Sequence, residues 1–123
     1  YKLLKYKKKF NSFPNPHIRT SGFLIKGSDY ISFIKKRKIT NKEDAWSVES
    51  GINGLTNYFK RKKYNIFIIN SDGLKFTESS WKLSETYNYL KQSKSLISDK
   101  HTRKYLKLSL SKRLIASYNS WGS

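Results

Sequence analysis

Residues 40–59 constrain the fold of this chain more than any other segment. Their apolar side chains recur every three or four residues, which is the spacing of one face of an α-helix. Thr40 and Glu43 have the spacing of a capping box at the start of this helix, and Asn41 and Asp44 fit that spacing less well. The pattern predicts one amphipathic helix with a single buried stripe. The stripe consists of Ala45, Val48, Ile52, Leu55 and Phe59.

Two glycines, Gly51 and Gly54, interrupt this helix on the side away from the stripe. Each weakens a helix by about 1 kcal/mol relative to alanine. We therefore expect these positions either to admit the close approach of another backbone or to mark a kink.

The segment before this helix predicts a strand and a short helix. Two prolines make residues 11–16 a loop. Residues 18–26 are expected to form a strand with a buried run at Phe23, Leu24 and Ile25. Ser28 can then cap a short helix.

The segment after it predicts a hairpin and a final helix. A β-branched and aromatic strand over 64–69 is followed by a strong turn signal at 70–73 and a returning strand at 74–77. Residues 78–98 fit a helix or a packed loop. Asp99 can cap a final helix over 100–118.

This order predicts a single α/β domain over residues 1–123, with a mixed sheet and flanking helices. The aromatic share of 15% argues against a disordered tail, and the absence of cysteine excludes disulfide or thiolate chemistry. No apolar run approaches the about 18 residues needed to cross a bilayer, so we expect a cytoplasmic protein. Because the sequence begins at Tyr1 without methionine, we expect it to start inside a longer protein.

The net charge of +18 has two interpretations. It favours polyanionic partners such as nucleic acid, an anionic membrane or phosphate-bearing substrates. It also fits the lysine-rich, asparagine-rich composition that an AT-rich genome encodes. The basic lead-in, residues 1–9, could touch a membrane surface with Leu3, Leu4 and Tyr6, or could be the end of a helix cut from its domain. Nucleic acid is the less favoured partner, because the sequence has no zinc-finger, RNP-like or helix-turn-helix pattern.

Glu49 is the first candidate for chemistry. It lies on or beside the apolar stripe, where partial desolvation raises the pKa of a carboxylate toward the range of a general base. The alternative is a structural carboxylate that accepts hydrogen bonds from its neighbours.

His17 and Arg19 form a second candidate site. On a strand, residues two apart point the same way, so both could hold a phosphate or a sugar hydroxyl. The alternative for His17 is a structural role at the entrance of the strand.

Asp99, His101 and Thr102 form a third candidate site at the start of the final helix. The imidazole and the carboxylate could bind a divalent metal, and a helix N-terminus attracts anions. The alternative is a plain N-cap by Asp99. The spacing is not that of a zinc site.

Three stretches, taken in order, resemble a family. Residues 17–25 (HIRTSGFLI) are similar to a strand of bacterial polysaccharide glycosyltransferases of the rhamnan-synthesis type. Residues 42–56 resemble the K-D-A…E-x-G…L-T helix of these enzymes. Residues 92–105 resemble their closing Q-x-x-x-L-x-x-D-x-H-T-x-x-Y segment, and Trp121-Gly122 matches a terminal W-G.

The resemblance covers residues 17–122 and implies the C-terminal part of a GT-A-like enzyme that acts on a nucleotide-sugar donor and a glycan acceptor. It implies that Glu49 is the general base and that His17, Arg19 and Thr20 bind acceptor or donor sugar. By analogy, Asp99 and His101 would lie near the diphosphate with Mg²⁺ or Mn²⁺. The D-x-D element of such enzymes is missing from this sequence. A peripheral contact with the inner face of the membrane fits this function.

Two other functions remain open at this point. A basic binding module without catalysis would account for the net charge, and an inactive remnant of the family would account for the missing D-x-D.

Overall fold

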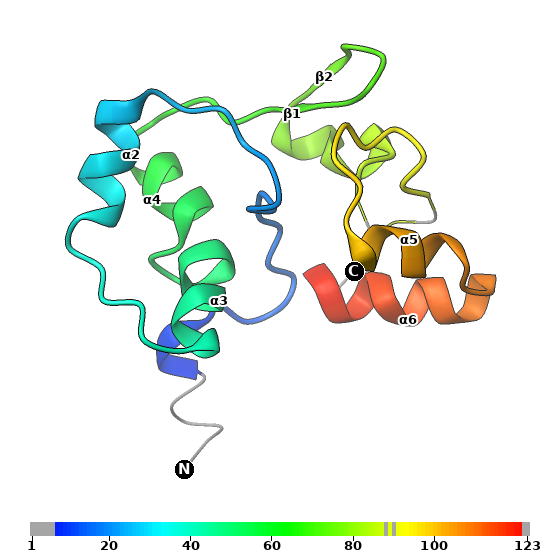
Figure 1. Cartoon of the computed structure of the whole chain (residues 1–123), viewed down its shortest axis with the longest axis horizontal. Helices are drawn as coiled ribbons and strands as arrows, with labels where there is room; N and C mark the ends of the chain where they lie inside the picture. The colour runs from blue at the N-terminus through cyan, green and yellow to red at the C-terminus, as the bar shows by residue number, and fades with distance from the viewer. Residues whose placement is uncertain (1–6, 88, 90, 122–123) are drawn as a thin grey trace. The chain divides into compact units, whose positions relative to one another are not determined.

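The computed structural model describes residues 7–87, 89 and 91–121 (Figure 1). The chain divides into two compact units, Tyr1–Tyr64 and Asn65–Ser123. The first unit is helical, and the second combines a two-stranded sheet with helices. The protein is therefore a small mixed α/β chain, as predicted. The expected sheet is reduced, within the described residues, to one antiparallel pair of strands.

The first unit contains α2 (Gly27–Ile34), α3 (Lys42–Ser50) and α4 (Leu55–Arg61). Its core is aromatic. The buried ring of Phe33 lies 5.1 Å from the ring of Tyr58 and 6.1 Å from that of Phe59. The Arg37 guanidinium covers Phe33 at 4.0 Å from the ring centroid. Large rings supply much buried area per residue, which suits a unit this small.

The helix predicted over residues 40–59 is broken into α3 and α4 by the glycine corner, residues 51–54. Both expectations for the glycines are confirmed. A Cβ at Gly51 would lie 3.0 Å from the carbonyl oxygen of Lys9 and closer still to that of Ser47. A Cβ at Gly54 would lie 2.8 Å from the carbonyl oxygen of Glu49. The prediction of a single buried stripe is therefore wrong. Leu55 and Phe59 are buried, whereas Ala45 is exposed.

Polar side chains bind the carbonyl oxygens that the break exposes. Helix ends leave such oxygens without intrahelical donors, and each needs another partner. The acceptor and donor pairs are Ser50 with Asn15 at 2.8 Å, Gly51 with Asn57 at 3.0 Å, Ile52 with Arg61 at 2.9 Å, and Asn53 with Arg37.

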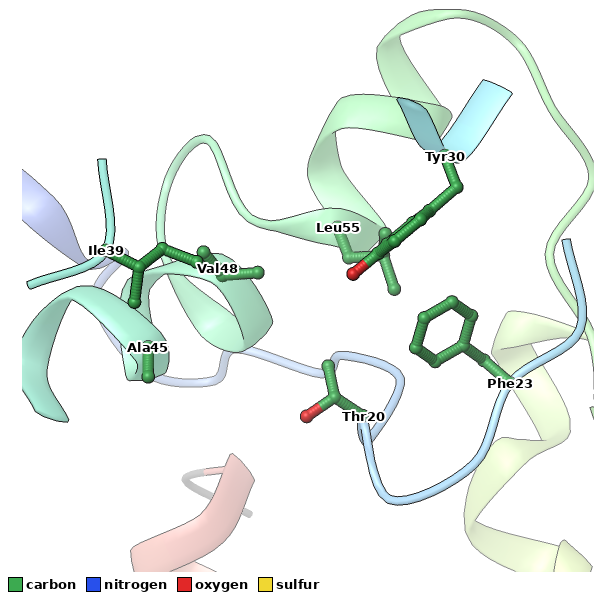
Figure 2. Close-up of a pocket in the computed structure, with 7 residues that line it drawn as sticks. All are labelled: Thr20, Phe23, Tyr30, Ile39, Ala45, Val48 and Leu55. Atoms are coloured by element: carbon green, nitrogen blue, oxygen red, sulfur yellow. The ribbon is translucent and has the colours of Figure 1, made fainter. Parts of the chain in front are cut away.

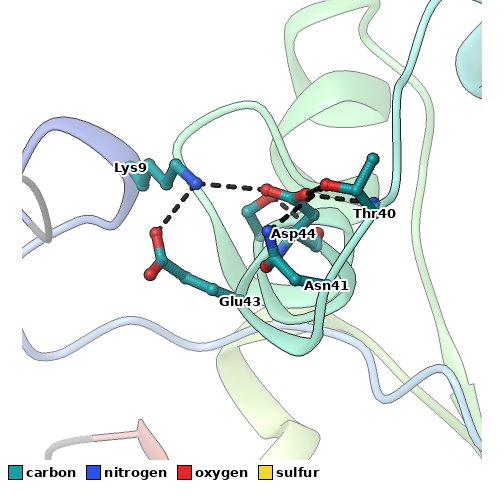
Figure 3. A network of polar contacts seen from close by, with 6 residues as sticks. Lys9, Thr40, Asn41, Glu43 and Asp44 are labelled. Atoms are coloured by element: carbon teal, nitrogen blue, oxygen red, sulfur yellow. Dashed lines mark hydrogen bonds and ion pairs between the residues drawn. The ribbon is translucent and has the colours of Figure 1, made fainter.

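A polar network fixes the start of α3 (Figure 3). The side chain of Asn41 caps the helix by accepting from the Asp44 amide at 2.9 Å. The Asp44 carboxylate accepts from the Thr40 amide and hydroxyl, and Lys9 Nζ lies 2.8 Å from Glu43 and 3.2 Å from Asp44. The bonds from Thr40, then that from Lys9, hold the pKa of Asp44 at about 2. The Asn41–Asp44 pair is therefore the cap, rather than Thr40–Glu43.

Residues 18–26, all of which the structure describes, form no strand, so this prediction is wrong. They form an extended loop with a turn at 20–22. Phe23 and Leu24 are exposed, not buried, and α2 begins at Gly27 without a side-chain cap from Ser28. The physical reason is that side chains of α3 and α4, not a neighbouring strand, bind the backbone of this segment.

The second unit opens with β1 (Ile68–Ile69) and β2 (Lys75–Phe76), which pair antiparallel with Ile68 opposite Phe76. Both strands are shorter than predicted. The turn between them is confirmed. The side chain of the buried Asn70 accepts from the amides of Asp72 at 3.1 Å and Leu74 at 3.0 Å, and Gly73 has a φ of 77°.

A 3₁₀ helix, η1 (Glu78–Ser84), follows, and then α5 (Lys100–Leu106) and α6 (Leu110–Trp121). The helix predicted over 100–118 is thus broken in two. The buried Tyr105 side chain has its hydroxyl 3.3 Å from Ser117 Oγ. This contact ties α5 to α6, and the two helices lie next to each other (Figure 1). The lead-in residues Leu3, Leu4 and Tyr6, and Gly122 of the terminal W-G, lie outside the described residues.

The glycine corner gives a first prediction. Gly51→Ala and Gly54→Ala should each lower the free energy of unfolding by about 1–3 kcal/mol, because the new methyl group meets backbone that cannot move away. Gly27→Ala is the matched control. It starts α2 with nothing within 4 Å and should be neutral or stabilising. Urea unfolding measures all three. Equal stabilities for all three variants would contradict the close approach at the corner.

Candidate functional site

The loop at residues 15–20 lies on α3 and α4 and brings several predicted residues together. The Ile18 amide donates to the buried Thr56 hydroxyl at 2.8 Å. The Thr20 amide donates to Glu49 Oε1 at 2.9 Å. Ile18 and Thr20, which lie two residues apart, are thus each bound by a side chain from a different helix. This arrangement fixes the loop without a sheet.

His17 is held inside this arrangement. Its Nδ1 lies 2.7 Å from the Asn15 carbonyl oxygen, which can only accept, so Nδ1 carries the proton. Nε2 is then an acceptor in the neutral ring. Burial lowers the pKa of His17, although the bond to Asn15 and the charge of Glu49 act in the opposite direction. The imidazole is therefore neutral at neutral pH.

Arg19 lies in the same loop between Ile18 and Thr20, and its charge lowers the pKa of His17, opposite to the effect of Glu49. We call His17, Arg19, Thr20 and Glu49 the loop–helix cluster. The sequence predicted each of its members. They come together although the strand expected to align them does not form. The cluster offers a carboxylate, a neutral imidazole, a hydroxyl and a guanidinium.

A pocket of about 250 Å³ lies beside the cluster (Figure 2). Thr20 belongs to both. The rings of Phe23 and Tyr30 form one wall, with centroids 5.4 Å apart and planes tilted by 47°. Figure 2 shows Ile39, Ala45 and Val48 on the opposite side. The remaining lining residue is Leu55. The lining is thus aromatic and aliphatic, with the hydroxyls of Thr20 and Tyr30 as its polar side-chain groups.

Sequence reasoning missed the aromatic wall. The sequence predicts Phe23 as part of a buried strand. No local motif marks Phe23 or Tyr30 as part of a pocket. Their pairing depends on the loop course that the hydrogen bonds to α3 and α4 impose.

Asp99, His101 and Thr102 belong to the second unit. Asp99 is the N-cap of α5, and its Oδ1 accepts from the Thr102 amide at 2.7 Å and the Thr102 hydroxyl at 3.0 Å. Thr102 is buried and His101 is exposed. The alternative of a plain N-cap is therefore the one that the structure shows for Asp99.

The described residues contain no group of three His, Asp or Glu side chains that could hold a metal ion. Binding of Mg²⁺ or Mn²⁺ stays a prediction. Nor does any described helix have the length and apolar character needed to cross a membrane.

Comparisons with protein-family models, with curated proteins and with solved structures found no match. The resemblance of residues 17–122 to polysaccharide glycosyltransferases therefore also stays a prediction.

A second prediction concerns His17. Its pKa is lower in the folded chain than the ordinary value of 6.5, so the unfolded chain binds a proton first as the pH falls. The stabilising contribution is therefore complete above about pH 6.5 and is lost as the pH falls from there toward the folded pKa. In urea unfolding, the free energy of unfolding should fall more between about pH 7.5 and about pH 5.5 in wild type than in His17→Gln. Parallel pH profiles would contradict the burial of a neutral imidazole.

A third prediction concerns the cap of α5. Asp99→Ala should lower the free energy of unfolding by about 1 kcal/mol, because it removes the acceptor for the Thr102 amide. Asp99→Asn keeps an acceptor for the Thr102 amide and should lower the free energy of unfolding by only a few tenths of that amount. Thermal and urea unfolding compare the two. An equal loss in both variants would mean that the negative charge of Asp99, and not its cap, stabilises the chain.

Proposed function

We propose that this chain is the acceptor-side part of a GT-A-like glycosyltransferase, which transfers a sugar from a nucleotide-sugar donor to a cell-surface polysaccharide. One observation carries the proposal. The Thr20 amide binds the Glu49 carboxylate at 2.9 Å. Two of the three stretches that resemble the family, residues 17–25 and 42–56, therefore meet at the residues to which the resemblance assigns function.

The chemistry of the cluster supports this function. In sugar transfer, an acceptor hydroxyl attacks the anomeric carbon, the bond from that carbon to the diphosphate oxygen breaks, and the hydroxyl proton must be removed. Glu49 has one carboxylate oxygen bound by Thr20, and its other oxygen takes that proton in our proposal. The carboxylate is held in place by backbone, so little reorganisation is needed.

The other members bind substrate in this proposal. Neutral His17 accepts a hydrogen bond from a sugar hydroxyl through Nε2, and the Arg19 guanidinium donates hydrogen bonds to sugar hydroxyls. Pyranose rings have apolar C–H faces, and the Phe23–Tyr30 wall of the pocket offers rings on which such a face packs. The acceptor glycan therefore occupies the pocket beside Glu49.

The donor side rests on the resemblance alone. Asp99, His101 and Thr102 are assigned to the diphosphate, with Mg²⁺ or Mn²⁺ as the cofactor that would neutralise its charge. Since Asp99 already caps α5, His101 is the better placed of the two to bind a ligand. We place the protein in the cytoplasm, at the inner face of the membrane, as part of this proposal.

A fourth prediction tests the base. Glu49→Gln keeps a carbonyl oxygen that accepts from the Thr20 amide but cannot take a proton. In the full-length protein, transfer from a panel of nucleotide sugars should fall by at least about 100-fold, the lower range for loss of a general base. The midpoint of thermal unfolding should stay unchanged, because the loop remains bound.

Glu49→Ala is the matched variant that also removes the acceptor. It should lose both activity and some stability. Full turnover by Glu49→Gln would refute the role as base and leave Glu49 with a structural function.

The net charge of +18 favours a second function, a basic module that binds a polyanion without catalysis. Such binding weakens steeply with salt, because it depends on released counterions. Steeply salt-dependent binding of a DNA or RNA duplex, without transfer of any sugar, would favour the module. An inactive remnant of the family would show neither property.

A further inference from the structure

Helix α6 presents an apolar side to solvent. Leu110, Leu114 and Tyr118 follow one another at intervals of four residues, and Ile115 lies beside them. Such spacing places them along one side of a helix. All four are among the exposed large apolar side chains, at 63%, 51%, 59% and 62% exposure for Leu110, Leu114, Tyr118 and Ile115. We call these four residues the α6 stripe.

The opposite side of α6 is the one that packs within the unit. Ser117 is buried and lies 3.3 Å from the Tyr105 hydroxyl of α5. Arg113 donates to the carbonyl oxygens of Leu108 at 3.0 Å and Leu106 at 2.6 Å. The helix thus turns small and polar residues inward and leucine, isoleucine and tyrosine outward. This is the reverse of the usual arrangement for a surface helix.

The segment that carries the stripe, residues 100–123, is rich in cations. From residue 100 to the end of the sequence there is no Asp or Glu. The same segment contains Lys100, Arg103, Lys104, Lys107, Lys112 and Arg113. Lys104, Lys107 and Lys112 are exposed at the end of α5 and in the first turn of α6.

This combination selects one occupant. The phosphates of a nucleic acid would bind the cations, but they gain nothing from contact with an aliphatic stripe. A second copy of the chain would place two strongly basic surfaces against each other, which repel. An anionic bilayer complements both features, because its headgroups attract the lysines and its acyl boundary accepts leucine and isoleucine side chains.

We propose that the α6 stripe docks the protein on an anionic lipid surface, with α6 lying in the plane of the interface. This contact does not depend on catalysis. The membrane contact considered for residues 1–9 is a different one. It involves Leu3, Leu4 and Tyr6, whereas the α6 stripe lies within residues 110–118 and inserts leucine, isoleucine and tyrosine side chains, an interaction that salt does not screen.

The fifth prediction separates insertion from charge. Co-sedimentation of the full-length protein would use vesicles of phosphatidylcholine alone and vesicles with about 30% phosphatidylglycerol, at about 0.1 M and about 0.5 M NaCl. Wild type should bind the anionic vesicles at both salt concentrations. Leu114→Gln/Ile115→Gln should retain binding at low salt and lose at least about tenfold at high salt, because glutamine does not enter the acyl boundary.

Leu83→Gln is the matched control. Leu83 is 69% exposed on η1, within the same unit but outside the stripe, and its variant should bind like wild type. Leu110→Gln, at the first residue of α6, provides a second variant of the stripe and should weaken binding at high salt in the same direction.

Three outcomes would overturn the proposal. Wild type could fail to bind anionic vesicles, or the double variant could bind them like wild type at high salt. A fall of more than about 5 °C in the unfolding midpoint of the double variant would show that protein covers the stripe.

Discussion

The glycine corner between α3 and α4 is the constraint on which the first unit depends. Side chains at residues 51 and 54 would collide with the backbone of α3, and at residue 51 also with Lys9. Their absence lets the Ile52 amide donate to the Lys9 carbonyl oxygen at 2.9 Å and lets Phe10 pair with Gly51. The chain before α2 is therefore fastened to the middle of what would otherwise be one continuous helix.

The same corner positions the candidate site. Breaking the helix exposes the Ser50 carbonyl oxygen, which accepts from the buried Asn15 side chain at 2.8 Å. Asn15 in turn binds His17 through its own carbonyl oxygen. Thr56 at the start of α4 and Glu49 at the end of α3 then bind the next part of the loop. A loop fixed at several points costs less entropy when it binds a ligand than one that must first become ordered.

Local features of the fold were predictable, whereas tertiary ones were not. The cap by Asp99 and the turn at residues 70–73 depend on side chains that bind their own neighbouring backbone, so the sequence contains all that is needed. The strand predicted over 18–26 was wrong. Its aliphatic residues fit a sheet, but the hydrogen-bond partners of this segment are Thr56 and Glu49, which lie more than 25 residues away in the sequence. The pocket wall of Phe23 and Tyr30 depends on this distant contact and has no local signal.

Amide hydrogen exchange at Ile18 and Thr20 measures whether side chains of α3 and α4 fix the loop that carries the candidate site. We expect slower exchange at these two amides than at Gly22 and Leu24 of the same loop, for which the structure gives no hydrogen-bond partner within its described residues. Glu49→Ala should remove the protection of the Thr20 amide and leave that of the Ile18 amide. Exchange of all four amides at the rate of an unstructured peptide would show that these side chains do not fix the loop.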